Sequence, residues 1–355
     1  MKNNLTTLIE LGRCIDKLIS MDAAEANGLA VQFKLFETAV NRSNAENPWF
    51  TRSNVILAFK GIVKLLEENA LRAFYSQYPI SSTNDNKKRI GLVMAGNIPM
   101  VGFHDLMCIL LSGNIAVVKL SSVDKILMNY LFDLMLSIDP GLKQSIVIVD
   151  KLSGIDAVIA TGSNNSSRYF EYYFGKYPHI IRKNRNAVAV LTGNEAEEDL
   201  KLLGYDIFNY FGLGCRNVSK LYVPQGYMFD TFFKSISSFG NELLMHNKYV
   251  NNYDYHHALF LLEKVKFLTN NFLIVKEDES IATPVSVLNY EMYDDLNILV
   301  QKLIQQADDI QCIISSNELN MPKFKEMHFN FGEAQYPAVN DFADGIDTMK
   351  FISEL

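Results

Sequence analysis

The sequence has 355 residues, of which 48% are hydrophobic and 21% are charged. These values are typical of a globular protein with two domains, or of one large α/β unit with additions, and they exclude a disordered chain. The net charge of −7 argues against a nucleic-acid-binding protein, because such a protein needs a surplus of Lys and Arg.

The longest apolar run, residues 106–111, is far shorter than the roughly 20 residues that span a bilayer. Charged residues interrupt the N-terminal stretch where a signal peptide would have its apolar region. We therefore expect a cytoplasmic protein without a membrane segment.

Residues 1–80 are predicted to form a helical N-terminal region. Apolar residues recur there at spacings of three and four, as in Leu5, Leu8 and Ile15 and again in Val55 and Phe59. The tract 81–88 is polar, rich in turn-forming residues and without periodicity, so we expect an exposed connection.

Strand and helix patterns alternate after this connection, beginning with a strand over 89–94, a helix over 99–111 and a strand over 115–120. Such a βαβ unit has parallel strands and a right-handed crossover. The pattern continues with a helix near 124–137, strands at 145–149 and 157–161, a helix near 166–174 and a strand at 187–191. The alternation predicts a doubly wound parallel sheet that binds ligands at the carboxyl ends of its strands.

A second α/β unit is predicted from residue 194, where four acidic residues between 195 and 199 suit the N-terminus of a helix. It continues with a strand at 218–223, a helix near 228–244, and strands around 258–262 and 272–275. The remaining residues form a C-terminal tail. Its acidic residues do not have the spacing of an EF-hand loop, so we interpret that part as a solvated turn.

The four cysteines are far apart and include no C-x-x-C pair, which predicts neither a zinc site nor a disulfide framework. Cys108 and Cys312 stand in apolar runs that are typical of a core, and Cys14 has no suggestive neighbours. Cys215 stands between Gly214 and Arg216 in a Gly-rich turn, where a neighbouring cation favours the thiolate. From local sequence alone, an inert cysteine remains the commoner interpretation of this pattern.

The six histidines do not predict a metal site, because no two of them share a helical face with an acidic partner. His104 is interpreted as a hydrogen-bonded core residue. His246, His256 and His257 are alternatives for an acid in the second unit, and their spacing does not choose among them.

Four segments, taken in order, resemble the aldehyde dehydrogenase superfamily. The first, Val93-Met-Ala-Gly-Asn-Ile-Pro99, resembles its asparagine-proline turn, and the second, Gly113-Asn-Ile-Ala-Val-Val-Lys119, resembles the strand that ends in its ribose-binding lysine. The third, Ile159-Ala-Thr-Gly-Ser163, is similar to its nicotinamide-nucleotide turn, and the fourth, Phe211-Gly-Leu-Gly-Cys-Arg216, is similar to its nucleophile loop. A weaker fifth match, Glu277-Asp-Glu-Ser-Ile-Ala-Thr-Pro-Val285, resembles the segment that steadies the nicotinamide ribose. Together the five segments cover about residues 90–290.

Within the superfamily, the sequence most resembles the acyl-CoA reductases typified by the fatty acid reductase of bacterial bioluminescence. Three further features carry this resemblance: Asn47-Pro-Trp-Phe50, the loop 212–217 and the tail 341–350. The resemblance implies an aldehyde-dehydrogenase-like α/β fold. Its parts would be the helical region 1–80, a nucleotide-binding domain 81–193, a catalytic domain 194–325 and a tail 326–355 that returns to the first domain.

The resemblance implies NADPH-dependent reduction of an acyl-CoA, of the fatty acyl type, to the aldehyde. Cys215 would be the nucleophile that expels coenzyme A, and the Asn97 side chain would meet the Cys215 amide in an oxyanion hole. The implied cofactor contacts are Lys119, Ser121, Ser122, Gly162, Ser163 and Glu279. From local sequence alone, a turn-capping asparagine is the commoner interpretation of Asn97 and a solvated strand-end lysine that of Lys119, and Gly162 and Ser163 are interpreted as turn-forming residues. The implied partners are an acyl-protein synthetase or acyltransferase, with assembly as a homo-oligomer.

The sequence also departs from the superfamily. Oxidising members carry a glutamate that activates water just before the strand at 187–191, and here residues 180–186 contain no carboxylate. In the fifth segment, Ser280 aligns with the usual glutamate, with Glu279 beside it, and Ala282 replaces the aromatic residue.

Two other functions stay open at this point. An acyl-phosphate reductase of the glutamyl phosphate reductase kind would need cationic clamps, for which the sequence offers Arg182, Lys183, Arg185 and Arg216. A non-catalytic scaffold that retains the fold is the other alternative, because a fold does not fix a function.

Overall fold

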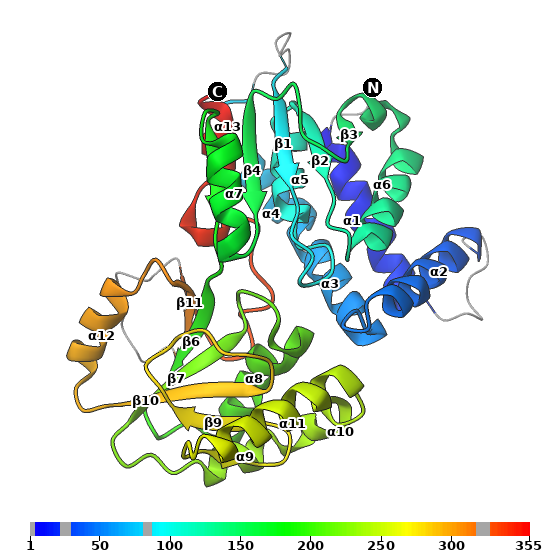
Figure 1. The fold of residues 1–355 in the computed structure, drawn as a ribbon. Helices are drawn as coiled ribbons and strands as arrows, with labels where there is room; N and C mark the ends of the chain where they lie inside the picture. Colours follow the sequence, from blue (N-terminus) through cyan, green and yellow to red (C-terminus); the bar gives the residue numbers. More distant parts are fainter. Residues whose placement is uncertain (1–3, 22–29, 81–86, 317–326) are drawn as a thin grey trace. The chain divides into compact units, whose positions relative to one another are not determined.

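The computed structural model describes residues 4–21, 30–80, 87–316 and 327–355. Most of the exposed connection expected over 81–88 therefore lies outside the described residues. The chain divides into two compact units, Met1–Lys183 with Pro337–Leu355, and Asn184–Tyr336 (Figure 1). Among the described helices, none is long and apolar enough to cross a membrane.

The N-terminal region is helical, as predicted. Its helices are α1 (Asn4–Ser20), α2 (Ala30–Glu46), α3 (Arg52–Leu65) and α4 (Glu68–Tyr75). Helix α1 buries the residues that recur at helical spacing, among them Leu8, Leu11 and Ile15. Helix α3 begins where the Thr51 side chain accepts a hydrogen bond from the Asn54 amide, which satisfies one of the free N–H groups of the first turn.

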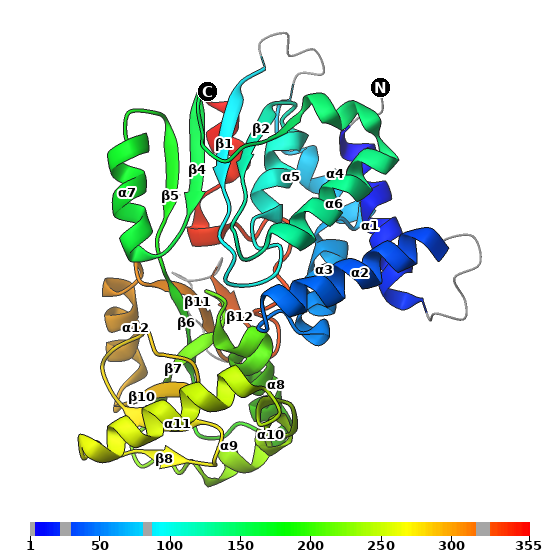
Figure 2. The same ribbon diagram turned by 45° about the vertical axis from the view of Figure 1, so that its right-hand side comes forward.

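The sheet of the first unit has five parallel strands in the order β3-β2-β1-β4-β5. Figure 2 shows β2, β1, β4 and β5 side by side. The strands are β1 (Arg89–Val93), β2 (Ile115–Lys119), β3 (Ile146–Ile148), β4 (Ala157–Thr161) and β5 (His179–Arg182). Their connections contain α5 (Phe103–Leu111), α6 (Lys125–Ile138), the 3-10 helix η1 (Pro140–Gln144) and α7 (Asn164–Phe174). This is the predicted doubly wound arrangement, with the strand order reversing between β1 and β4.

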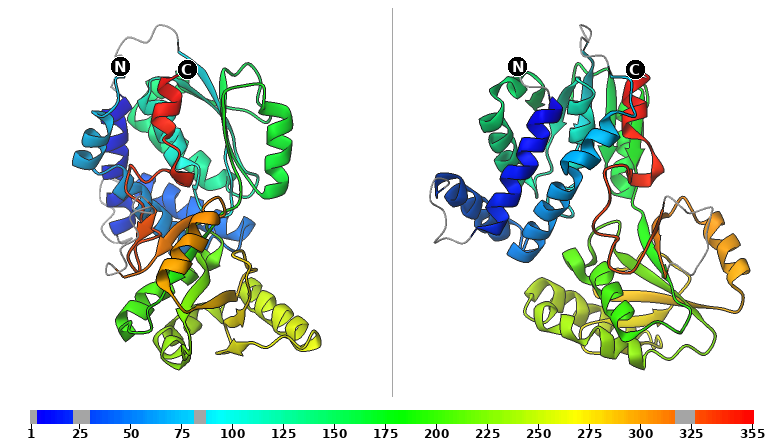
Figure 3. Two further views of the ribbon diagram at one scale, coloured as in Figure 1. Left: turned by 90° about the vertical axis from the view of Figure 1, so that its left-hand side faces the viewer. Right: turned by 180° about the vertical axis from the view of Figure 1, so that it is seen from behind.

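Helices cover both faces of this sheet. Helix α7 packs its Phe170 and Phe174 against a cluster on one face that includes Val158 and Val117. Helix α13 (Thr348–Ser353), near the C-terminus, lies on the opposite face and contacts α5 (Figure 3). The last 19 residues, Pro337–Leu355, thus belong to the first unit.

A buried ion pair joins this C-terminal segment to the sheet. The Arg182 guanidinium, at the end of β5, donates to both carboxylate oxygens of Asp105 on α5 at 2.6 and 3.0 Å. It also donates to the Thr348 hydroxyl at 3.1 Å. Arg182 and Asp105 are both buried, and the Arg182 charge holds the pKa of Asp105 below its ordinary value despite the desolvation that opposes it.

The second unit has a seven-stranded sheet in the order β12-β11-β6-β7-β10-β9-β8, parallel except for the β8–β9 pair. The strands are β6 (Asn186–Val190), β7 (Val218–Pro224), β8 (Leu268–Thr269), β9 (Ile274–Glu277), β10 (Val287–Tyr293), β11 (Ile310–Ile314) and β12 (His328–Phe329). Its helices are α8 (Glu197–Phe208), the 3-10 helix η2 (Asn209–Gly212), α9 (Asp230–Ser235), α10 (Gly240–Leu243), α11 (Asn247–Leu262) and α12 (Leu296–Gln305).

Several details differ from the sequence prediction. The prediction of a strand around 258–262 is wrong, because these residues form the C-terminal end of α11. Periodicity does not distinguish a short apolar strand from a segment of a buried helix. The helix expected near 228–244 is broken into α9 and α10. Strand β6, which the sequence analysis placed in the nucleotide-binding domain, pairs with β7 and β11 and belongs to the second unit.

Candidate active site

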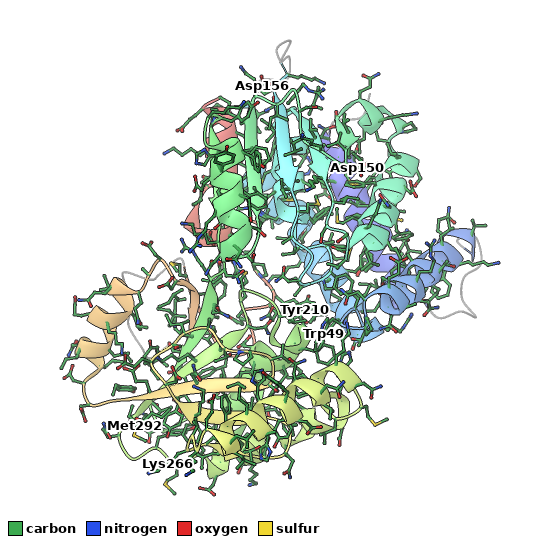
Figure 4. The ribbon with its side chains drawn as sticks, in the orientation of Figure 1. Trp49, Asp150, Asp156, Tyr210, Lys266 and Met292 are labelled. Carbon is green, nitrogen blue, oxygen red and sulfur yellow. The ribbon has the colours of Figure 1, made fainter. Side chains whose placement is uncertain are left out.

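Cys215 lies in a turn between η2 and β7, and the chain that leads into this turn has an unusual backbone. Tyr210, Phe211 and Gly212 have φ angles of 53°, 57° and 77°, so three successive residues are left-handed. This conformation costs roughly 1–3 kcal/mol for each non-glycine residue, and it persists only where packing enforces it. Tyr210 (labelled in Figure 4) and Phe211 are buried, and the Phe211 ring lies 4.2 Å from the His246 imidazole, centroid to centroid.

Asn217 fixes the other side of the same turn. Its Nδ2 donates to the carbonyl oxygens of Asp206 and Asn209 at 2.9 and 2.8 Å, at the end of α8. Its Oδ1 accepts the Gly214 amide at 2.8 Å. The side chain is 1% exposed, so these bonds are shielded from water. Asn217 thereby holds the backbone on both sides of Cys215, a role that the sequence analysis did not assign.

Cys215 differs from the other three cysteines in its surroundings. None of the four forms a disulfide in the described structure. Cys108 and Cys312 are fully buried, and burial raises the pKa of Cys108 well above its ordinary value. Burial also raises the pKa of Cys14, which is on helix α1. Cys215 is half-buried in a turn, next to Arg216, whose guanidinium carbon lies 5.0 Å from the centre of the Phe329 ring.

Asn97 stands in the loop that follows β1, at the carboxyl edge of the first unit's sheet, and is exposed. Met100 in this loop has a φ of 54°, and its amide donates to Asp124 Oδ2 at 2.7 Å. Asp124 follows β2 and is 3% exposed, and its Oδ1 has no hydrogen-bond partner among the described residues. Burial raises the pKa of Asp124 to about 8. The Asn97 loop is therefore tied to the loop after β2 by a buried carboxyl group.

The predicted cofactor residues of the first unit gather at the same carboxyl edge. Lys119 ends β2 and is exposed, followed by Ser121 and Ser122. A Cβ at position 96 would collide with the Ser121 hydroxyl, so Gly96 lets the loops after β1 and β2 approach each other. Ser163 caps α7 by accepting the Ser166 amide at 3.2 Å, with Gly162 before it at the end of β4.

A cavity of about 470 Å³ opens beside these residues. Its lining combines apolar side chains, aromatic side chains of α7, three lysines and an aspartate, Asp150 (labelled in Figure 4). The lining residues are Val93, Lys119, Asp150, Lys151, Leu152, Ile155, Tyr169, Phe170, Tyr173, Phe174, Lys176 and Tyr177. Apolar and aromatic walls suit an adenine ring and ammonium groups suit phosphates, so the cavity fits the adenosine half of a dinucleotide. Lys151 and Lys176 are not predicted from the sequence, because no local motif marks them.

Glu279, the remaining predicted cofactor residue, lies in the loop between β9 and β10 of the second unit and is exposed. Cys215 belongs to the same unit, whereas Asn97, Lys119 and Ser163 belong to the first. The preceding residue, Asp278, accepts from Lys276 and from the Ser280 amide, which lowers the pKa of its carboxyl to about 2.

Other residues weighed in the sequence have structural partners. His104 Nε2 lies 2.8 Å from the Val339 carbonyl oxygen, and His246 caps α11 through Nδ1. Burial lowers the pKa of His256. No group of three or more His, Cys, Asp or Glu side chains that could hold a metal occurs in the part of the chain that the structure describes.

Solved structures of similar fold are aldehyde dehydrogenases. The aldehyde dehydrogenase of Brucella melitensis biovar abortus 2308 has a TM-score of 0.60 and 12% identity, over 92% of this chain and 81% of that chain. Aldehyde dehydrogenase 21 of Physcomitrella patens, solved with succinate, has a TM-score of 0.59 and 15% identity, over 98% of this chain and 87% of that chain. The aldehyde dehydrogenase KauB of Pseudomonas aeruginosa has a TM-score of 0.58 and 12% identity, over 92% and 80%. These likenesses confirm the predicted fold.

A family comparison then makes the assignment more specific. The family model described as acyl-CoA reductase (LuxC) matches residues 28–215, just over half of the chain, and the match ends at Cys215. The chain belongs to the acyl-CoA reductase (LuxC) family and is an oxidoreductase of the aldehyde dehydrogenase type. A search of the curated proteins gave no significant match.

Proposed function

We propose that this protein reduces an acyl-CoA thioester, of the fatty acyl type, to an aldehyde with NADPH. The observation that carries the proposal is the half-buried thiol of Cys215, which forms no disulfide and lies in a turn that Asn217 holds, directly after three left-handed residues. A thiol in a fixed turn, with an arginine next to it in the sequence, is suited to nucleophilic attack on a carbonyl carbon.

The Cys215 thiolate attacks the thioester carbonyl and forms a new carbon–sulfur bond. The Cys215 backbone amide and the Asn97 side chain are the proposed donors to the developing oxyanion. Collapse of this adduct breaks the bond to coenzyme A and leaves the acyl group on Cys215. When bound, NADPH supplies the hydride that reduces this thioester, and Cys215 departs as a thiolate when the aldehyde is released.

The cavity of the first unit supports the choice of a dinucleotide cofactor, because its lining combines apolar and aromatic side chains with Lys119, Lys151 and Lys176. Ser122 supports NADPH over NADH. An acidic residue near that position would bind the ribose hydroxyls of NADH and repel a 2′-phosphate, whereas a hydroxyl tolerates it.

The acyl-phosphate alternative loses the support of two of the four basic residues that suggested it. Arg182 is buried in its pair with Asp105, and Arg185 donates to the Ala307 carbonyl oxygen at 3.3 Å. These guanidinium groups already serve the fold. Family membership supports the further proposals that a synthetase or acyltransferase partner delivers acyl groups and that the chain forms a homo-oligomer.

The test is to incubate the protein with acyl-CoAs of graded chain length without cofactor and locate the acyl group by peptide mass spectrometry. We expect it on Cys215, and we expect Cys215→Ala to abolish both acylation and NADPH consumption. The matched control is Cys14→Ala, which changes the other half-buried thiol and leaves both readouts unchanged. Acylation of another cysteine, or no NADPH consumption at any chain length, contradicts the proposal.

A further inference from the structure

The loop between β9 and β10 is clamped to the sheet by an unusual set of hydrogen bonds. Three consecutive backbone carbonyl groups each accept a bond from a different side chain of β7 or β10. The bonds are Lys220 Nζ to Glu279 O at 2.6 Å, Asn289 Nδ2 to Ser280 O at 2.8 Å and Ser219 Oγ to Ile281 O at 2.6 Å. All three donors are buried, with exposed fractions of 0%, 2% and 6% for Lys220, Asn289 and Ser219.

Lys220 contributes a charge to this clamp. Its ammonium also donates to Glu291 Oε2 at 2.8 Å and lies 4.9 Å from the centre of the Tyr222 ring. The same Glu291 carboxylate is bonded to Lys302, which is partly exposed. A buried ion pair is weak evidence for stability, since apolar residues of similar volume often stabilise a fold as well or better. A gain in stability therefore does not explain why Lys220, and not an apolar residue of similar volume, occupies this position.

A β-bulge allows neighbouring residues to reach the same loop. Strand β6 pairs Ala187 with Val218 and Val188 with Lys220, so Ser219 is an extra residue on β7. Bulges re-aim side chains and are frequent next to active sites. This bulge lies four residues after Cys215, so the nucleophile turn and the clamp follow each other directly along the chain.

We propose that Lys220, assisted by Ser219 and Asn289, is a positioning residue that fixes the backbone of residues 279–281 and so orients the Glu279 carboxylate toward the ribose hydroxyls of the cofactor. This inference rests on the proposed function. The clamp fixes the backbone of Glu279, and the exposed carboxylate of this residue is a hydrogen-bond acceptor of the kind that a vicinal diol needs. The clamp serves cofactor binding and reduction, and the acylation of Cys215 does not depend on it.

The first test compares Lys220→Met with wild type. Methionine keeps most of the side-chain volume, and Glu291 keeps Lys302 as its partner, so no buried charge is left alone. In the cofactor-free protein we expect hydrogen exchange of the amides at 278–284 to rise at least tenfold, with exchange in β7 unchanged. With cofactor, we expect the Kd for NADPH, measured by fluorescence, to rise at least fivefold, while Cys215 acylation by acyl-CoA stays within twofold.

Lys302→Met is the matched control, because it removes the other ammonium from Glu291 without touching the loop. It should leave exchange at 278–284, NADPH affinity and acylation unchanged. Ser219→Ala removes one neutral hydrogen bond of the clamp and serves as a milder second variant in case Lys220→Met fails to fold. We expect it to raise exchange at 278–284 and the Kd for NADPH by twofold to threefold.

Two outcomes overturn the inference: unchanged exchange at 278–284 in both clamp variants, or equal losses in acylation and in NADPH affinity. Failure of the proposed function looks different. In that case the wild-type protein itself shows neither acylation of Cys215 nor binding of NADPH.

Discussion

Asn217 Oδ1 accepts the backbone amide of Gly214 at 2.8 Å, and Cys215 lies between the two bonded residues. Because the Nδ2 of the same side chain holds the carbonyl groups at the end of α8, one buried amide connects a helix end, the nucleophile turn and the start of β7. The fixed backbone holds the Cα of Cys215 in place, which reduces the entropy that must be lost before the thiol attacks.

We therefore predict that Asn217→Ala lowers both stability and reactivity. Each buried group left without its hydrogen-bond partner should lower the free energy of unfolding by about 1–3 kcal/mol. The loosened turn should also slow Cys215 acylation at least tenfold. Urea unfolding and the rate of acylation by acyl-CoA measure the two effects. Asn114→Ala is the control, since Asn114 is also buried and bonded through both side-chain atoms, to Lys88 and Ser112 in the first unit. Equal acylation rates in the two variants would refute the role given to Asn217.

A second prediction concerns the pH dependence of stability through Asp124. Burial raises the pKa of this carboxyl to about 8 in the folded protein, against about 3.9 for an unfolded chain. The folded state thus keeps a proton that the unfolded state loses between about pH 4 and pH 8, so stability from this group falls as pH rises through that range and levels off above it.

Asp124→Asn removes this titration and keeps an oxygen that can accept the Met100 amide. The variant should be close to wild type in stability near pH 4 and more stable near pH 8. Between pH 4 and pH 8, the difference in the free energy of unfolding between the variant and wild type should grow by up to about 1.4 kcal/mol per pH unit. Urea unfolding at several pH values measures it, with Asp133→Asn on the exposed side of α6 as the control. Parallel curves for Asp124→Asn and wild type would show that the folded carboxyl is ionised throughout.

The sequence predicts some elements closely because their signals are local. Strands β1, β2 and β4 are continuous apolar runs bounded by turn residues, and the structure places them within a residue of the expected ends. Strand β5 is not predicted, since only Ile180 and Ile181 are apolar between a proline-containing turn and basic residues. The Arg182–Asp105 pair spans 77 residues and the Lys220–Glu279 bond spans 59, so no window of sequence contains either of them.

A third prediction concerns the cavity of the first unit. We expect Lys151 and Lys176, which line it, to attract the phosphates of the cofactor. Replacing both by glutamine should raise the KM for NADPH about tenfold, equivalent to about 1.4 kcal/mol, and should affect NADH less because it lacks the 2′-phosphate. Wild type should use NADPH at least as well as NADH. Lys143→Gln, on η1 and outside the cavity lining, is the control. An unchanged ratio of the two cofactors in the double variant would count against this use of the cavity.

The last prediction is that the acyl-cysteine is hydrolysed slowly, so that reduction outcompetes release of the free acid. A thioester is consumed by attack of water or of hydride, and a positioned general base typically accelerates the first by roughly 10²–10⁴-fold. Residues 180–191 contain no carboxylate, in the stretch where oxidising relatives are expected to carry their glutamate.

Installing that base should convert the enzyme toward a hydrolase. The alignment allows position 181 or 182, but Arg182 is buried against Asp105, so replacing it would leave that carboxylate without its cation and unfold the region. Ile181 is half-buried on β5 and is the better position. Ile181→Glu should raise cofactor-free release of acid from acyl-CoA and lower the aldehyde yield, whereas Ile181→Gln, which has the same shape and no base, should do neither. If wild type already releases acid as fast as it makes aldehyde, then some other group activates water, and Glu279 becomes the first residue to replace.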